Sequence, residues 1–152
     1  MKPLAVLLIV FCIVMPVSRL AGGTWDYVLS GNVAMAAMLL FTAIGHFVYR
    51  EGMAMMVPEY VPAKKQLVYF TGIMEIIFAV GLCIPDVRRL AADLLILFFL
   101  LVLPANVNAA QKSISYQKAD HKGHGVNYLW LRIPMQVFFI LWVAYFGMIV
   151  KY

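Results

Sequence analysis

A single carboxylate, Glu75, lies in the middle of the apolar stretch 67–83, which has the composition of a membrane span. At the centre of a bilayer an ionised side chain costs at least about 2.5 kcal/mol, even on the mildest insertion scales. A carboxyl group is therefore kept there only where it faces the protein interior and finds a partner, or where it stays protonated. Glu75 is for this reason the first residue that the sequence marks as a candidate for chemistry.

Other apolar stretches carry polar side chains that can reach Glu75 or one another. Together with Glu75, the candidate ligand-binding residues are His46, Tyr69, Asn106, Asn108, Arg132 and Gln136. Arg132 and Gln136 are four residues apart, so they share one face of a helix. Thr71 and Glu75 have the same spacing. Because these side chains fall in the same half of their spans, the sequence predicts a polar pocket in the bundle core, open toward one leaflet.

Two interpretations of this set stay open. In the functional one, Glu75 and His46 form an ionisable pair in a ligand pocket, and Arg132 supplies a counter-charge. In the structural one, Glu75 pairs with Arg132, and the asparagines join helices through hydrogen bonds of about 0.6 kcal/mol each. For Asn106 and Asn108 the structural interpretation is favoured.

The composition places these residues in a helical membrane protein. Of the 152 residues, 64% are hydrophobic and 12% are charged, and the mean hydropathy is +0.90. Soluble domains are near half apolar and about one quarter charged. The apolar stretches are continuous, unlike the alternating pattern of a β-barrel. The net charge of +5 lies in loops and at helix ends, so it bears on topology and anionic lipid rather than on nucleic acid.

Five apolar stretches are long enough to cross a hydrocarbon core of about 30 Å as helices. They lie at about 3–20, 31–50, 67–84, 90–110 and 131–150. The segments 22–23 and 30–32 predict a break between the first two. Pro104 lies inside the fourth stretch, where it removes the helical partner of the Leu100 carbonyl and predicts a kink. Neighbouring side chains are expected to satisfy that carbonyl.

We therefore expect an all-α bundle of five membrane spans. Residues 1–30 form an N-terminal helix and short loop, and residues 31–152 form a four-helix unit. The first stretch resembles a signal peptide, and cleavage after it stays open.

Lysine and arginine are distributed unequally between the two sides of this bundle. Eight lie on one side, namely Lys2, Arg50, Lys64, Lys65, Lys112, Lys118, Lys122 and Arg132, and four lie on the other, namely Arg19, Arg88, Arg89 and Lys151. Because cytoplasmic loops carry the excess of these residues, we expect a cytoplasmic N-terminus and a periplasmic or external C-terminus.

Metal and thiol chemistry find little support in the sequence. His121 and His124 lie in the polar loop 111–130 without the further ligands of a metal site, so we expect a solvated loop and no metal. Cys12 and Cys83 lie in separate stretches and form no CxxC pair. We expect both to be small buried apolar residues.

Four segments carry a recognisable pattern, namely GHFVYREGMAMMVPEYVP, YFTGIMEIIFAVGL, RRLAADLLILFFLLVLPANVNAA and WLRIPMQVFFILW. Their markers are Gly45, His46, Val57, Pro58, Pro62, Gly72, Glu75, Ile76, Gly81, Arg89, Pro104, Ala105, Asn106, Leu131, Arg132, Pro134 and Gln136. Together, over residues 31–150, they resemble the DoxX-like family of small bacterial membrane proteins. The resemblance implies a four-helix membrane bundle, here preceded by one additional helix, in a bacterial inner membrane.

The same resemblance implies a connection with membrane redox chemistry. The family name comes from a subunit of a thiosulfate:quinone oxidoreductase, and relatives are linked with redox complexes and with chaperone-like assembly of membrane receptors. Most members have no assigned reaction, and a shared fold does not fix a function.

We predict an integral membrane protein whose polar pocket binds a quinone or a lipid, as an accessory subunit of membrane redox chemistry. Glu75 and His46 are expected to hydrogen-bond the head group or to relay protons. The alternative is a non-catalytic assembly or chaperone protein, and a membrane isomerase with Glu75 as proton shuttle is the least favoured. The expected partners are membrane lipid, a membrane oxidoreductase subunit or a second copy of the chain, and no nucleic acid.

Overall fold

The computed structural model describes residues 2–115, 117, 119 and 127–149, and this part of the chain is helical throughout its length apart from short connections. The helices are α1 (Lys2–Gly22), α2 (Tyr27–Val48), α3 (Arg50–Met56), α4 (Lys64–Cys83), α5 (Pro85–Gln111), α6 (Asn127–Val143) and the π-helix η1 (Ala144–Ile149). Five helices in the described part are long and apolar enough to cross a membrane: α1, α2, α4, α5, and the continuous α6–η1 helix. The prediction of an all-α chain with five helices of spanning length is confirmed.

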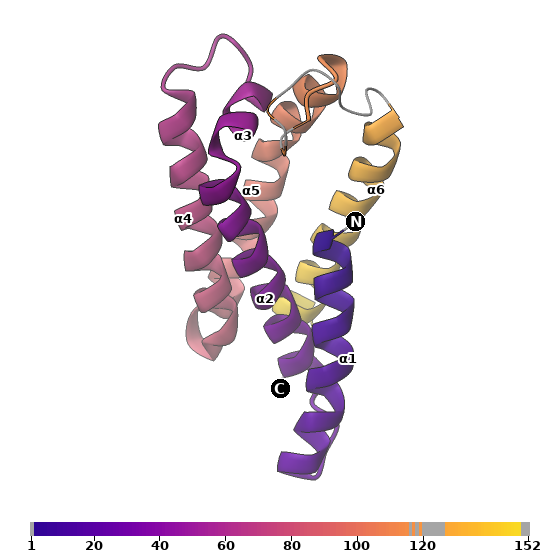
Figure 1. Cartoon of the computed structure of the whole chain (residues 1–152). Helices are drawn as coiled ribbons and strands as arrows, with labels where there is room; N and C mark the ends of the chain where they lie inside the picture. The colour runs from indigo at the N-terminus through magenta and orange to yellow at the C-terminus, as the bar shows by residue number, and fades with distance from the viewer. Residues whose placement is uncertain (1, 116, 118, 120–126, 150–152) are drawn as a thin grey trace.

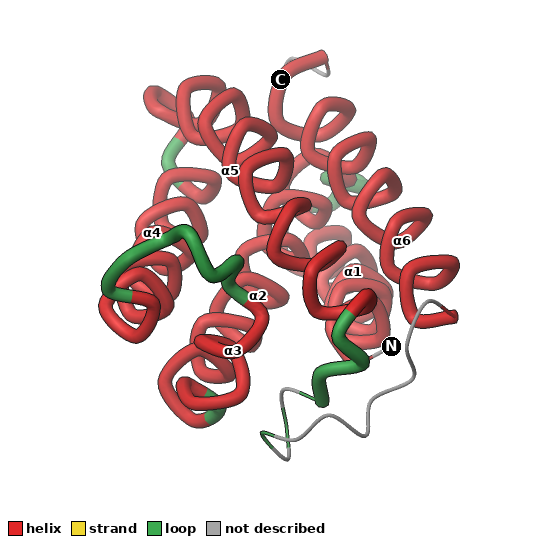
Figure 2. The backbone as a smooth tube through the Cα atoms, turned by 90° about the horizontal axis from the view of Figure 1, so that it is seen from above, coloured by secondary structure: helices red, strands yellow, loops and turns green. Residues whose placement is uncertain are grey.

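The long helices pack in chain order around the bundle. Each of α1, α2, α4, α5 and α6 contacts the next, and η1 returns to contact α2. Figure 1 shows α1 set along the lower part of α2, and the short helix α3 at the opposite end of the bundle. Seen down the bundle in Figure 2, α5 and α6 lie along one side, with α4, α2 and α1 along the other. One end of each of α2, α4 and α5 therefore lies next to α3, and α6 begins at the same end of the bundle.

The second helix begins earlier than the sequence suggested. Asp26 caps α2, because its Oδ1 accepts a hydrogen bond from the Leu29 amide at 2.8 Å. The segment 30–32, expected to be a break, is helical, and both Ser30 and Asn32 are buried. The expected division of the chain between residues 30 and 31 therefore falls inside α2. The buried hydroxyl of Ser30 is satisfied inside the helix, because it donates to the Asp26 carbonyl of the preceding turn.

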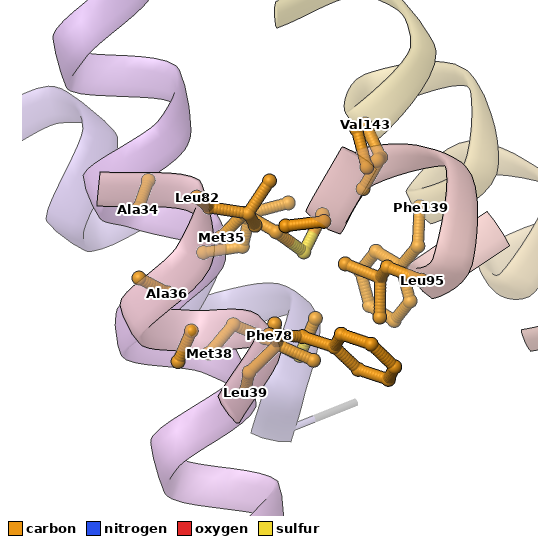
Figure 3. Packing of buried hydrophobic residues seen from close by; sticks show 14 of the residues in the cluster. Ala34, Met35, Ala36, Met38, Leu39, Phe78, Leu82, Leu95, Phe139 and Val143 are labelled. Carbon is orange, nitrogen blue, oxygen red and sulfur yellow. The ribbon is translucent and has the colours of Figure 1, made fainter. Parts of the chain in front are cut away.

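The hydrophobic core lies between α2, α4, α5 and α6. Met35 and Leu39 from α2, Leu82 from α4, and Leu95 from α5 are almost fully buried. Figure 3 shows these side chains pointing toward one another, with Phe139 and Val143 of α6 closing the far side. The outward faces carry exposed isoleucine, leucine and phenylalanine, as expected for helices whose outer surface is solvated by lipid.

Two cysteine predictions are wrong. Cys12 and Cys83 were expected to be buried, but both are exposed. An apolar stretch in a membrane bundle has two apolar faces, one toward the core and one toward lipid, so hydrophobicity alone does not tell them apart.

The fourth long helix also differs from its prediction. It runs from Pro85 to Gln111, because proline is well suited to the first turn of a helix. Arg88 was expected in the loop before this helix, with the charges on the non-cytoplasmic side. It lies instead within the first turns of α5 and is buried, with 6% of its surface exposed. Its Nε donates a hydrogen bond to the Leu82 carbonyl at 2.9 Å and so satisfies the end of α4. Lys118, Lys122 and Lys151, which also entered the charge comparison, lie outside the described residues.

Candidate functional site

A buried histidine–glutamate pair joins α2 to α4. His46 lies near the end of α2, and its Nε2 is 3.5 Å from Oε1 of Glu75. The Glu75 side chain is 8% exposed and the His46 side chain is 16% exposed. Among the described residues, the side chain that faces the Glu75 carboxylate at ion-pair distance is therefore that of His46 rather than Arg132.

Thr71 contacts the other ring nitrogen of His46. The threonine hydroxyl lies 2.9 Å from the Val68 carbonyl, to which it can donate. Its oxygen is also 3.1 Å from Nδ1 of His46, and which of the two donates in that contact depends on the imidazole tautomer. The contact orients the ring so that Nε2 faces Glu75.

The pair depends on a close approach of the two helices. Gly72 lies one turn before Glu75, and a Cβ built on it would be only 2.9 Å from Cβ of His46. Two ordinary side chains do not pack this closely, so a glycine is required where α2 and α4 cross. The sequence placed Gly72 among the markers but gave it no role.

The second carboxylate oxygen of Glu75 is buried without a partner. No donor in the described part of the chain reaches Oε2. A buried acceptor left without a hydrogen bond costs about 1–3 kcal/mol, and more when it is charged. Oε2 is therefore a buried polar atom that no described residue satisfies.

A second polar network joins α5 to α6. Gln136 donates through Nε2 to the Phe99 carbonyl, and its Oε1 accepts from Nδ2 of Asn106 at 3.2 Å. The Phe99 carbonyl directly precedes that of Leu100, which loses its helical donor to Pro104. Gln136 therefore bonds the carbonyl before the one that Pro104 frees, and the expected partner for the Leu100 carbonyl stays a prediction.

The direction of these hydrogen bonds fixes the orientation of both amides. The Phe99 carbonyl can only accept, so the amide nitrogen of Gln136 must face it. Oε1 of Gln136 then accepts from the amide nitrogen of Asn106. Oδ1 of Asn106 consequently points away from Gln136, and within the described residues it too is buried without a donor.

Both networks lie between an aromatic layer and α3. Phe78 of α4 contacts Phe98 of α5, and Phe99 contacts Phe139 of α6, with ring centroids 5.6 Å and 6.2 Å apart. Glu75 lies about one helical turn before Phe78, and Gln136 about one turn before Phe139. Asn106 lies about two turns after Phe99. In each helix this is the side of the ring that is nearer to α3. We call this part of the bundle the polar half.

Asn108 and Tyr69 serve other contacts. Nδ2 of Asn108 donates to the Met56 carbonyl at 2.7 Å and so fastens the end of α3 to α5. The Tyr69 hydroxyl accepts from Arg50 at 2.6 Å, on the outer surface. Arg132 is half-buried at the beginning of the α6 span and has an interaction of its own. The sequence predicted these seven residues as one site. In the structure His46, Glu75, Asn106 and Gln136 form the two networks of the polar half, whereas Tyr69, Asn108 and Arg132 make other contacts.

Two open grooves lie at the α3 end. One, of about 520 Å³, lies between α3 and the beginning of α4 and is bordered by Glu51, Lys64 and Lys65. The other, of about 420 Å³, lies outside α5 at its proline; its walls are Pro58, Tyr60, Leu100, Leu103, Pro104, Val107, Asn108 and Gln111. Among the predicted site residues only Asn108 borders either of them.

Sequence reasoning missed a polar contact at the opposite end. Asn32, only 2% exposed, donates to the carbonyls of Val28 and Phe146 at 2.8 and 2.9 Å. Trp142 donates to the Gly31 carbonyl at 3.0 Å. These contacts bind α2 to the π-helix η1. The signal was present, since an asparagine inside an apolar stretch requires a partner, but the segment was interpreted as a break.

Metal ligands do not gather in the described part of the chain, where no three His, Cys, Asp or Glu side chains come together. His121 and His124 lie outside the described residues, and with them the prediction of a solvated loop free of metal.

Comparison with known proteins adds one family. The sequence pattern of a domain of unknown function, DUF8561, matches residues 35–146. This range begins inside α2, includes α3 to α6, and leaves α1 outside. No curated protein and no solved structure matches the chain.

Proposed function

The chain belongs to the DUF8561 family, and we propose that it binds a quinone or a lipid in the polar half of its membrane bundle, as an accessory subunit of membrane redox chemistry. The observation that carries this proposal is the buried Oε2 of Glu75, which accepts no hydrogen bond from the described residues. A binding site is the usual explanation for an ionisable side chain held at this depth with an unused oxygen.

The His46–Glu75 pair gives such a site the means to exchange a proton. Thr71 contacts Nδ1 of His46 at 3.1 Å and leaves Nε2 facing Oε1 of Glu75 across 3.5 Å. The His46 side chain is the more exposed of the two, at 16% against 8%, and His46 lies two residues before the end of α2, next to α3. A head group bound at Oε2 would thereby be in hydrogen-bonding contact with a group that can take up or release a proton.

The architecture supports a DoxX-like core with one added helix. The family match covers α3 to α6 and most of α2, which are the segments that carry the resemblance. We propose that α2, α4, α5 and α6 are the four-helix core, that α1 is the addition, and that the protein resides in a bacterial inner membrane. By the distribution of lysine and arginine, the α3 end faces the cytoplasm.

A non-catalytic assembly role is the second candidate. Its support is that Asn106, Asn108 and Gln136 all make hydrogen bonds between helices or between α3 and α5. Such contacts specify packing and need no ligand. A partner protein would then occupy an outer surface of the bundle, and Glu75 would serve stability alone.

Native mass spectrometry of gently purified protein tests the choice. Wild type, Glu75→Gln and Glu75→Leu are compared, with Glu51→Gln as the matched control because Glu51 is an exposed carboxylate on α3. Glutamine keeps an acceptor but cannot exchange the proton, whereas leucine removes both oxygens. A small molecule retained by wild type and by the control, weakened in the glutamine variant and lost in the leucine variant, supports binding. Retention that is equal in all four contradicts it, and a co-purifying protein without any small molecule favours assembly.

A further inference from the structure

We propose that the groove between α3 and the beginning of α4 binds an anionic phospholipid of the surrounding membrane, whose phosphate contacts Lys64 and Lys65 and whose acyl chain lies along the outer face of α4. This site is separate from the polar half, and it does not depend on whether Glu75 binds a ligand. The space, the charge and the depth of the groove each support this occupant.

The groove has room for a phospholipid head group. Its volume of about 520 Å³ falls in the usual range for small-molecule sites, about 300–1,000 Å³. The walls come from two helices, and the residues that form them are Glu51, Ala54, Met55, Ala63, Lys64, Lys65 and Gln66. Ala54 packs into a small apolar cluster beneath α3, whereas the side chains of Glu51 and Lys65 are exposed. Figure 1 shows the connection from α3 to α4 at one end of the bundle, so the groove lies at that end.

Positive charge exceeds negative charge around this groove. Of the described residues that line it, Glu51 is the one acidic side chain. Its carboxylate is already shared between Lys65, whose Nζ is 2.9 Å away, and Arg50, whose Nε is 3.9 Å away. Lys64 adds a third basic group. Three basic groups thus face one carboxylate, and an anion in the groove is attracted to them.

Lys64 is the basic group with the fewest contacts. Its side chain is half-buried, and among the described residues no carboxylate forms a salt bridge with it. The pKa of the nearby Glu59 carboxyl is lowered chiefly by its hydrogen bond from Lys112 and to a smaller extent by Lys64. The first turn of α4 contains no acidic side chain, so the helix dipole adds to the positive charge there. A phosphate supplies the counter-charge that the described residues do not give to Lys64.

The depth of the groove matches the level of lipid phosphates. The 20 residues of α4 rise about 30 Å, which is the thickness of the hydrocarbon core, so its first turn lies at the boundary of one leaflet. Below Gln66 the same helix face carries exposed apolar side chains at intervals of four and three residues, namely Phe70, Ile73, Ile77 and Val80. Half of the core corresponds to about ten residues of helix. An acyl chain that begins at Gln66 therefore passes Phe70 and Ile73 and ends near Ile77.

This combination of charge and depth distinguishes a lipid from a free phosphate. A free phosphate uses the lysines but not the apolar face below them, whereas a phospholipid uses both. Basic pockets between helices on the cytoplasmic side, where we place the α3 end, are typical sites for anionic head groups. A zwitterionic lipid carries the same phosphate together with a cation, which the three basic groups repel.

The test is native mass spectrometry of the full-length protein released from nanodiscs that contain equal amounts of phosphatidylglycerol and phosphatidylcholine with identical chains. Wild type, Lys64→Gln and Lys65→Gln are compared with Arg89→Gln. Arg89 is exposed near the beginning of α5, at the opposite end of the bundle, so this control removes the same charge from the chain but none from the groove. A basic residue at the membrane surface contributes about fivefold to the binding of an anionic lipid. We expect wild type to retain phosphatidylglycerol at least about fivefold more than phosphatidylcholine. Each lysine variant should lower this ratio severalfold, and Arg89→Gln should keep it.

Each other outcome overturns the inference. Equal retention of the two lipids by wild type, or retention of neither, shows that the groove does not select an anionic lipid. A ratio that Lys64→Gln and Arg89→Gln lower alike shows attraction by net charge without a site. Displacement of the lipid by excess glycerol phosphate shows a site for a free phosphate. Glu75→Leu should keep the wild-type ratio whatever it does to the ligand of the polar half, so a failure of this inference and a failure of the proposed function are distinguishable.

Discussion

Substitution of Gly72 by alanine tests whether the crossing of α2 and α4 exists to bring His46 to Glu75. A Cβ at this position would lie 2.9 Å from Cβ of His46 and 3.4 Å from the ring of Phe47, whereas 3.4 Å is the lower limit of ordinary contact. The helices must therefore separate locally by about 0.5 Å. Both neighbours are on α2, and the Cβ of His46 cannot move by rotating its side chain.

The same displacement acts directly on the ionisable pair. The separation of Nε2 and Oε1 is 3.5 Å, so a further 0.5 Å takes the contact to the outer limit for an ion pair, about 4 Å. Overpacking of this kind costs about 1–3 kcal/mol of the free energy of unfolding. Alanine is otherwise the better helix former by about 1 kcal/mol, so the net loss of stability should be about 0–2 kcal/mol.

Gly45→Ala is the matched control. Gly45 lies on α2 one position before His46, and the nearest atom to a Cβ there would be the flexible end of Met53 at 3.5 Å. This change should be neutral or slightly stabilising. The assay is thermal unfolding in a mild detergent, followed by native mass spectrometry of the retained ligand. We expect Gly72→Ala to melt at a lower temperature than Gly45→Ala and to retain less ligand.

The reasoning is refuted if Gly72→Ala retains ligand as wild type does and melts no lower than Gly45→Ala. Such a result would mean that the helices tolerate separation and that the His46–Glu75 distance is not set by this crossing. A loss of stability with unchanged ligand retention would refute only the connection between the pair and binding.

Three further predictions concern other contacts of the bundle. Gln136→Leu should lower the free energy of unfolding by about 1 kcal/mol, because it removes two interhelical hydrogen bonds; an unchanged melting temperature would show that this network contributes nothing. Gly31→Ala should cost about 1–3 kcal/mol, since its Cβ would lie 2.4 Å from a ring carbon on η1, whereas Gly22→Ala, with nothing within 4 Å, should match wild type; equal melting temperatures would count against the α2–η1 contact. The pKa of the Glu59 carboxyl lies below its ordinary value of 4.5 because the ammonium group of Lys112 donates a hydrogen bond to it. The unfolded chain therefore takes up this proton first, and the contribution of the pair is present above about pH 4.5 and is lost as the pH falls through the lower folded value. Thermal unfolding across this acid range should show a smaller pH dependence for Glu59→Gln than for wild type, and identical profiles would contradict the prediction.

The sequence was sufficient to predict the helices because their signal is strong and local. Apolar stretches of spanning length, ended by Gly22, Pro58 or Pro85, leave few alternatives in a lipid environment, where backbone groups must bond within the segment. The helix ends were less predictable. The start of α2 depends on the Asp26 cap, and the helical state of residues 30–32 depends on contacts with η1, more than a hundred positions away.

The members of the site were predicted, but the partner of Glu75 was left open between His46 in the functional interpretation and Arg132 in the structural one. The choice is decided by the rotation of α4 about its axis, which turns Glu75 toward α2, and by Gly72, which lets His46 approach. Helical periodicity specifies which residues share a face, but it does not specify which neighbour that face meets.

The polar contacts at the two ends of the bundle differ in a way that bears on function. At the η1 end the amide nitrogen of Asn32 donates to the Val28 and Phe146 carbonyls, and Trp142 donates to the Gly31 carbonyl. At the α3 end Oε2 of Glu75 and Oδ1 of Asn106 are buried and receive no hydrogen bond from the described residues. Helix packing alone is served best when every buried polar atom has a partner, since each unsatisfied atom subtracts from stability. The two unsatisfied oxygens lie in the same half of the bundle, and one of them belongs to the one carboxylate that is buried among the described residues. A loss of stability confined to the half that holds a buried ionisable group is what a binding site there requires.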